Sequence, residues 1–174
     1  GRGGSALTMQ ENHAQLLDHN NRLADEGMRV IAIAQRDLTI EAWNEFVILF
    51  KEAHPGENLP GFPIWADDWV HEKDLVIPEG TPKWKSDFLE KNSAFYTTHK
   101  SALDKWLNKW NRLQDFPPSR RMFEWQAQDT ENLWGTIMHF RPSGIRAKKP
   151  TYVPALVAIT QTSIVGKLKR RLTV

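Results

Sequence analysis

Cysteine is absent from this chain of 174 residues. Its absence excludes disulfides, thiolate metal sites and a cysteine nucleophile within the chain. Long apolar runs are missing as well, since no stretch approaches the roughly 18 apolar residues that a membrane-spanning helix needs. The N-terminus lacks the basic-then-apolar pattern of a signal peptide. We therefore expect a cytoplasmic protein without a membrane partner.

Acidic residues are absent from the C-terminal part of the chain. Glu131 is the last of them, and residues 132–174 hold eight cations, in a chain whose net charge is only +2. A cationic segment without anions is typical of a surface that binds a polyanion such as nucleic acid. The alternative is a solvated basic tail, but strand-like apolar runs in the same stretch argue against it.

Recognisable metal and cofactor motifs are also lacking. The six histidines are scattered, and no pair has zinc-ligand spacing backed by a third ligand. The glycines near the N-terminus follow no predicted strand, so the sequence does not support a nucleotide or adenosyl cofactor site. We expect no metal and no cofactor in this chain.

Aromatic residues, in contrast, are plentiful. The chain has eight tryptophans and eight phenylalanines, with 40% hydrophobic and 25% charged residues overall. A chain of this length and composition can bury a core. It is typical of one globular domain, or of a small domain with a tail.

Apolar periodicity predicts helices in the first third of the chain. Residues 11–26 have helical spacing and end at Gly27, where a helix cap is expected. Residues 29–35 are short, apolar and β-branched, which favours a buried strand. A second helix is expected from an N-cap at Thr39 to residues 54–56. Its apolar face comprises Trp43, Phe46, Val47 and Phe50.

The middle of the chain predicts an ordered loop and more helix. Residues 55–82 are rich in turns and aromatics, and we expect them to pack around their own rings. Residues 83–113 are helical in pattern, with a break near residues 92–98. The stripe that we assign to the core comprises Leu103, Trp106, Leu107, Trp110 and Leu113. Strands are expected over residues 133–140 and 152–159.

A basic loop is predicted between these two strands, over residues 141–150. Arginine suits bidentate contacts with phosphate or guanine, and serine with glycine would let the backbone approach a phosphate. A polar run after the second strand would face the same ligand. The alternative is a surface turn with solvated lysines. The predicted DNA-binding residues are Arg141, Ser143, Gly144, Arg146, Lys148, Lys149, Thr160, Gln161, Thr162 and Lys169.

An ordered series of segments resembles bacterial DNA cytosine-5 methyltransferases. The resemblance extends from about Trp43 to Thr173 and includes residues 60–65. Its segments are Phe116-Pro-Pro-Ser-Arg-Arg121, Phe123-Glu-Trp-Gln-Ala-Gln128, Phe140-Arg-Pro-Ser-Gly-Ile-Arg146, Lys149-Pro-Thr-Tyr152, Pro154-Ala-Leu-Val-Ala-Ile-Thr-Gln-Thr162 and Arg170-Arg-Leu-Thr173. In that family the segment before the Arg-Arg-Leu-Thr element is the target-recognition region. The element itself opens a motif that positions this region against the catalytic domain.

The resemblance also implies what this chain needs from elsewhere. The family attacks C6 of cytosine with a cysteine thiolate and holds its cofactor with a glycine loop, and this chain has neither. It implies S-adenosylmethionine in the parent enzyme and no catalysis by the chain alone. We expect a fragment, one half of a split enzyme or a degenerate gene product. Its partners would be double-stranded DNA, whose cytosine is flipped out of the helix, and a methyltransferase catalytic domain or subunit.

The sequence thus predicts an α+β fold, with a helical recognition region and a small C-terminal β element. Residues 1–38 would be a helix–strand lead-in, residues 39–166 the target-recognition region, and residues 167–174 the start of a C-terminal methyltransferase motif. Residues 24–36 also resemble a segment of P-type ATPase nucleotide domains, so two origins stay open for the lead-in.

Four further arginines have secondary roles in this interpretation. Arg170 and Arg171 are expected at the interface with the catalytic domain, and Arg120 and Arg121 are additional candidates for DNA contact. The expected function is DNA binding for a restriction-modification methyltransferase. The two alternatives are a stand-alone nucleic-acid-binding protein and an inert protein-interaction domain. Salt-dependent retention on DNA separates the last from the others.

Overall fold

The computed structural model describes residues 9–151 and 162–172, and the chain divides into two compact units, residues 1–38 and 39–174. The predicted α+β class is confirmed, because long helices are combined with a mixed sheet. One helix, α1 (Met9–Ala53), contributes residues to both units. None of the helices in the described ranges has the long apolar stretch that a membrane crossing needs.

Unit 1 is helical throughout its described residues. Gly27 lies inside α1, and Val30 and Ile33 are 66% and 50% exposed. The predicted helix end at Gly27 and the predicted buried strand over residues 29–35 are therefore wrong. Strand propensity depends on a partner and on burial, whereas each residue added to an existing helix gains a backbone hydrogen bond.

The part of α1 in unit 2 carries the predicted apolar face. Trp43, Phe46, Val47 and Phe50 are fully buried, and the helix ends at Ala53 as the following turn residues predict. Thr39, predicted as an N-cap, instead lies within the continuous helix.

The segment between the two long helices contains little regular secondary structure, as predicted. It contains β1 (Ile64–Trp65) and the 3-10 turns η1 (Ala66–Asp68) and η2 (Glu72–Asp74). Its rings pack against the helices and not only against one another. The ring of Trp69 lies 5.8 Å from that of Tyr96 and 6.2 Å from that of Trp106.

Helix α2 (Lys83–Lys109) is kinked at His99, whose φ and ψ are −107° and 15°. The break was expected in the residues just before it. The buried residues Leu103, Trp106 and Leu107 confirm most of the predicted core stripe, and Leu113, in η3 (Asn111–Leu113), is buried too. Trp110 is only partly buried. The turn η4 (Pro118–Arg120) leads into the sheet.

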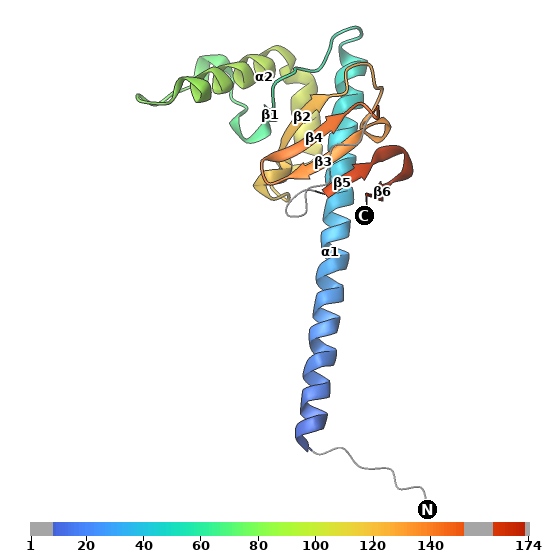
Figure 1. Ribbon diagram of the computed structural model, residues 1–174. Helices are drawn as coiled ribbons and strands as arrows, with labels where there is room; N and C mark the ends of the chain where they lie inside the picture. Colours follow the sequence, from blue (N-terminus) through green and yellow to red (C-terminus); the bar gives the residue numbers. More distant parts are fainter. Residues whose placement is uncertain (1–8, 152–161, 173–174) are drawn as a thin grey trace, which may run out of the picture. The chain divides into compact units, whose positions relative to one another are not determined.

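In the part of the chain that the structure describes, six strands form one mixed sheet in the order β1-β2-β4-β3-β5-β6, and Figure 1 labels each of them. The remaining elements are β2 (Met122–Gln126), η5 (Leu133–Gly135), β3 (Ile137–Arg141), β4 (Gly144–Lys148), β5 (Thr162–Val165), η6 (Gly166–Leu168) and β6 (Arg170–Arg171). β2 and β4 run parallel, and the other neighbours run antiparallel. The C-terminal β element is thus larger than predicted.

The predicted basic loop over residues 141–150 is mostly strand, so this expectation is wrong. Strands β3 and β4 form a hairpin whose turn is Pro142–Ser143. Gly144 follows the turn with a φ of 119°, and a Cβ there would come within 2.9 Å of the backbone oxygen of Met122. Both its conformation and its close approach to β2 require glycine at this position.

The flanking strands were predicted less completely. The one expected over residues 133–140 begins only at Ile137, because residues 133–135 form the turn η5. The strand expected over residues 152–159 lies outside the described residues.

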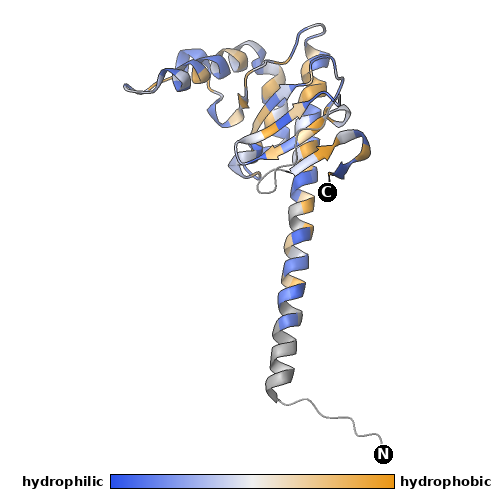
Figure 2. Cartoon of the chain, viewed as in Figure 1, coloured by the Kyte–Doolittle hydropathy of each residue, from blue (hydrophilic) through white to orange (hydrophobic). Residues whose placement is uncertain are grey.

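An aromatic cluster joins the elements of unit 2. The ring of Trp43 stacks on Phe123 of β2 at 4.7 Å, and the ring of Phe46 lies 5.1 Å from Trp106 of α2. The core therefore lies between the end of α1, α2 and one face of the sheet. Figure 2 shows hydrophobic and hydrophilic residues alternating along these elements, as one-sided burial requires.

Candidate nucleic-acid interface

The face of the sheet away from the aromatic core carries a row of polar side chains. The strand register places Glu124 of β2 beside Arg146 of β4, Arg146 beside His139 of β3, and His139 beside Ser163 of β5. Successive residues of a strand point to opposite faces. The apolar neighbours of these residues, such as Phe123, therefore face the core.

Glu124 is the acidic centre of this row and is only 6% exposed. Its Oε2 accepts hydrogen bonds from Arg141 Nη2 at 2.9 Å and Arg146 Nε at 2.8 Å, and Gln126 donates to Oε1. Two predicted DNA-binding arginines are thus brought together by one buried carboxylate. The contact fixes their guanidinium groups while leaving the local charge positive.

His139 lies beside the arginines and is itself buried. Its Nδ1 is 3.1 Å from Ser163 Oγ, and its Nε2 is buried without a hydrogen-bond partner among the described residues. Burial, with the nearby charges of Lys148, Arg141 and Arg146, lowers the pKa of His139. The imidazole is therefore uncharged at neutral pH.

The two additional arginine candidates have contacts within the fold. Arg120 donates to the backbone oxygen of Arg141 at 3.2 Å and lies over the ring of Phe140, and burial lowers its pKa. Arg121 donates to the backbone oxygen of Phe116 at 2.7 Å. Both side chains tie the segment before β2 to its neighbours.

Exposed cations gather at the C-terminal end of the sheet. Lys167 of η6, Lys169, and Arg170 with Arg171 of β6 are all exposed. Lys149 is partly exposed and pairs with Asp129 at 2.7 Å. Exposure suits these groups to contact with a polyanion, since an exposed cationic group keeps its charge without a large desolvation cost.

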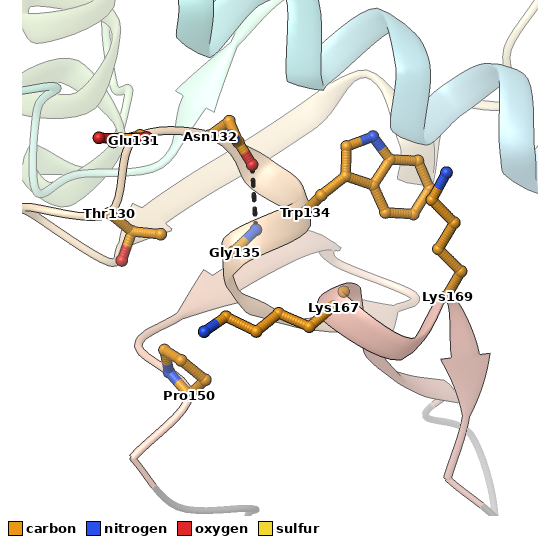
Figure 3. A pocket seen from close by; sticks show the side chains of 9 residues that line it. Thr130, Glu131, Asn132, Trp134, Gly135, Pro150, Lys167 and Lys169 are labelled. Carbon is orange, nitrogen blue, oxygen red and sulfur yellow. Dashed lines mark hydrogen bonds between the residues drawn. The ribbon is translucent and has the colours of Figure 1, made fainter.

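A cavity of about 540 Å³ opens between η5 and η6 (Figure 3). Trp134 and the two lysines Lys167 and Lys169 line it, with the Lys169 ammonium 4.9 Å from the centre of the Trp134 ring. Turn η6 lies so close to η5 that a Cβ at Gly166 would overlap the backbone oxygen of Trp134, so glycine is needed at this position. An aromatic ring beside two cations can hold an anion that carries a planar group.

The remaining predicted site residues are dispersed. Ser143 is exposed in the β3–β4 turn, whereas Gly144 is buried against β2. Thr162 begins β5 opposite Phe140, and Thr160 and Gln161 lie outside the described residues. The sequence interpretation missed Glu124, because its role depends on strand register, and it missed Trp134, because a lone aromatic residue carries no local signal.

Elsewhere in unit 2, three possible metal ligands meet. His54 follows α1, Glu57 lies three residues later, and His99 is at the kink of α2. One ligand atom from each lies within 4.8 Å of the other two.

Comparison with known proteins identifies a relative. The type II methyltransferase M.AluI of Cellulosimicrobium cellulans is 42% identical over an alignment that covers 78% of this chain and 34% of that protein. This chain therefore spans about a third of the length of the relative. No family model and no solved structure matches the chain. The resemblance to a bacterial methyltransferase that the sequence predicted is confirmed.

Proposed function

Because this chain is related to a type II methyltransferase over most of its own length, we propose that it is the target-recognition portion of a DNA cytosine-5 methyltransferase of a restriction-modification system. In this proposal residues 39–166 form the recognition region, residues 1–38 a lead-in, and residues 167–174 the start of the motif that meets the catalytic domain. The observation that carries the proposal is the 42% identity.

The charge distribution supports DNA as the ligand. The eight cations after residue 131 end up on neighbouring strands and turns of one sheet, and those of η6 and β6 are exposed. In the proposed complex Lys148, Lys149 and Lys169 neutralise phosphates, which gives affinity without sequence preference.

Sequence preference would come from the arginines that Glu124 holds. Arg146 meets the carboxylate through Nε, and a guanine edge would be read by the terminal nitrogens of the same guanidinium. Arg141 shares the carboxylate but is buried more deeply, with 17% of its side chain exposed against 31% for Arg146. Arg146 is therefore the better candidate for base contact.

Catalysis in this proposal belongs to a separate domain or subunit in the cytoplasm. That partner supplies the cysteine nucleophile, which this chain lacks, and binds S-adenosylmethionine. Arg170 and Arg171, exposed on β6, are the proposed contacts with it. The chain alone is expected to transfer no methyl group from labelled S-adenosylmethionine to duplex DNA.

Selection from a pool of random duplexes tests the recognition role. The full chain is immobilised, the pool is washed at increasing salt, and retained DNA is sequenced, with and without a methyltransferase catalytic domain. Enrichment of one short sequence supports a recognition region. Retention without enrichment in both states favours a stand-alone nucleic-acid-binding protein, and no salt-dependent retention favours a protein-interaction domain.

A further inference from the structure

We propose that His54, Glu57 and His99 form a binding site for a zinc ion, which fastens the segment after α1 to the kink of α2. The sequence spacing predicts no metal site here, since 45 residues separate the two histidines. The fold brings the two histidines together, because α1 and α2 pack against each other through aromatic residues. The ring of Phe50 in α1 packs against the rings of Phe95 and His99 in α2.

One donor atom from each of the three side chains lies within 4.8 Å of the other two. His99 Nδ1 lies 3.1 Å from His54 Nε2, and Glu57 Oε1 lies 3.3 Å from His99 Nε2. The second carboxylate oxygen is 3.8 Å from His54 Nδ1, so Glu57 approaches the nitrogen of each ring that is not in contact with the other histidine. A tetrahedral zinc ion with bonds of about 2.0–2.1 Å places its ligand atoms about 3.3 Å apart. To enclose the ion, the rings must therefore turn so that one nitrogen of each faces the same point as one carboxylate oxygen.

The surroundings make one ligand rigid and leave the others adjustable. His99 is only 5% exposed, and its ring lies 5.0 Å from Phe50 and 4.8 Å from Phe95. Glu57 has 49% of its side chain exposed and His54 has 26%. A fixed imidazole with two mobile neighbours can close on an ion that arrives from solvent.

The donor atoms select the class of metal. Two imidazole nitrogens and one carboxylate oxygen suit zinc and its neighbours in the first transition row, whereas calcium and magnesium prefer oxygen ligands alone. Three protein ligands leave the fourth tetrahedral position to water. Without the metal, the short nitrogen–nitrogen distance is explained by a hydrogen bond between one neutral imidazole and the other.

Zinc titration of the full, chelator-treated chain tests the site. Binding is followed by calorimetry and by the thermal midpoint, and Co²⁺ replaces Zn²⁺ for the visible spectrum of a tetrahedral site. We expect one tight equivalent, a midpoint that rises with zinc, and visible Co²⁺ bands. His54→Gln and Glu57→Gln change partly exposed ligands, and each should weaken zinc binding at least about tenfold.

His71→Gln is the matched control, because His71 caps η2 and lies outside the cluster. It should bind zinc like the unaltered chain. The proposal is overturned if the unaltered chain takes up no stoichiometric zinc, or if His54→Gln and Glu57→Gln bind it as tightly as the control. In that case the cluster is a hydrogen-bonded histidine pair. DNA binding is not part of the readout, so this result is independent of the proposed recognition role.

Discussion

At the scale of single residues, Trp106 connects the two helices of unit 2. Its ring is 1% exposed and its Nε1 donates to the backbone oxygen of Ala42 at 2.8 Å. Trp106→Ala should lower the free energy of unfolding by about 3–5 kcal/mol, because it leaves a large cavity and an unpaired carbonyl. Urea denaturation measures the change. Trp84→Ala is the control, since Trp84 is 68% exposed, and equal losses for both variants would contradict the assignment to the core.

Glu124 is the second residue whose role can be measured. Glu124→Gln keeps the side-chain shape but removes the charge that two partly buried guanidinium groups share. We expect a loss of about 3 kcal/mol in the free energy of unfolding, as for a buried ion pair that loses one partner. The matched control is Glu131→Gln at an exposed acid. Denaturant midpoints that are the same for both variants would show that Glu124 does not organise the arginines.

Two buried histidines determine how stability depends on pH. Burial lowers the pKa of both His99 and His139 below the ordinary value of 6.5. Below that value the unfolded chain binds protons that the folded chain does not. The contribution of the two neutral histidines to stability is therefore fully present above about pH 6.5 and is lost as the pH falls.

The expected slope is at most about 1.4 kcal/mol per pH unit for each histidine. Denaturant unfolding between about pH 7.5 and 5.5 measures it, in a range above the ordinary titration of carboxylates. His139→Gln should flatten the slope by removing one of the two contributions. An unchanged slope in this variant would mean that the pKa of His139 is the same in the folded and the unfolded chain.

At the scale of elements, the continuity of α1 has a direct test at Gly27. Nothing described lies within 4 Å of a Cβ at this position, and the residue is helical. Gly27→Ala should therefore raise helicity in far-ultraviolet circular dichroism and stabilise the helix by about 1 kcal/mol. Gly56→Ala should have the opposite effect on stability, because Gly56 has a φ of 85°. Lower helicity in Gly27→Ala would indicate a helix cap instead.

The elements also show which sequence signals were sufficient. The end of α1 and the core half of α2 could be predicted because bulky apolar residues recur there at helical spacing. The run around Val30 was misjudged as a strand, since β-branched residues signal a strand only where a partner buries them. In residues 141–150, glycine and lysines suggested a loop. The alternation of Ile145 and Ala147 with charged residues was the stronger signal.

At the scale of the whole molecule, contacts between distant segments decide the candidate site. Glu124 meets its arginines across 17 and 22 residues, and His54 meets His99 across 45. No local pattern encodes such contacts, because they depend on strand order and helix packing. The charge imbalance after Glu131, by comparison, is visible in the sequence, and it restricts the proposed ligand contacts to residues 132–174.

The salt dependence of DNA affinity tests the central claim most directly. Affinity for duplex DNA is measured over a salt series for the unaltered chain and for two double variants, Lys148→Ala with Lys149→Ala and Lys167→Ala with Lys169→Ala. If these lysines contact phosphates, each lost contact should reduce the slope of log affinity against log salt by about 0.9, for all sequences alike.

The control for this measurement is Lys73→Ala with Lys105→Ala, which removes the same charge from exposed positions outside the basic stretch. Its slope should match that of the unaltered chain. Binding is measured with and without a methyltransferase catalytic domain, so that an incomplete interface does not hide the effect. In both C-terminal variants, the slope of log affinity against log salt should fall by the equivalent of up to two phosphate contacts. Slopes and affinities equal to those of the control in both states would contradict it.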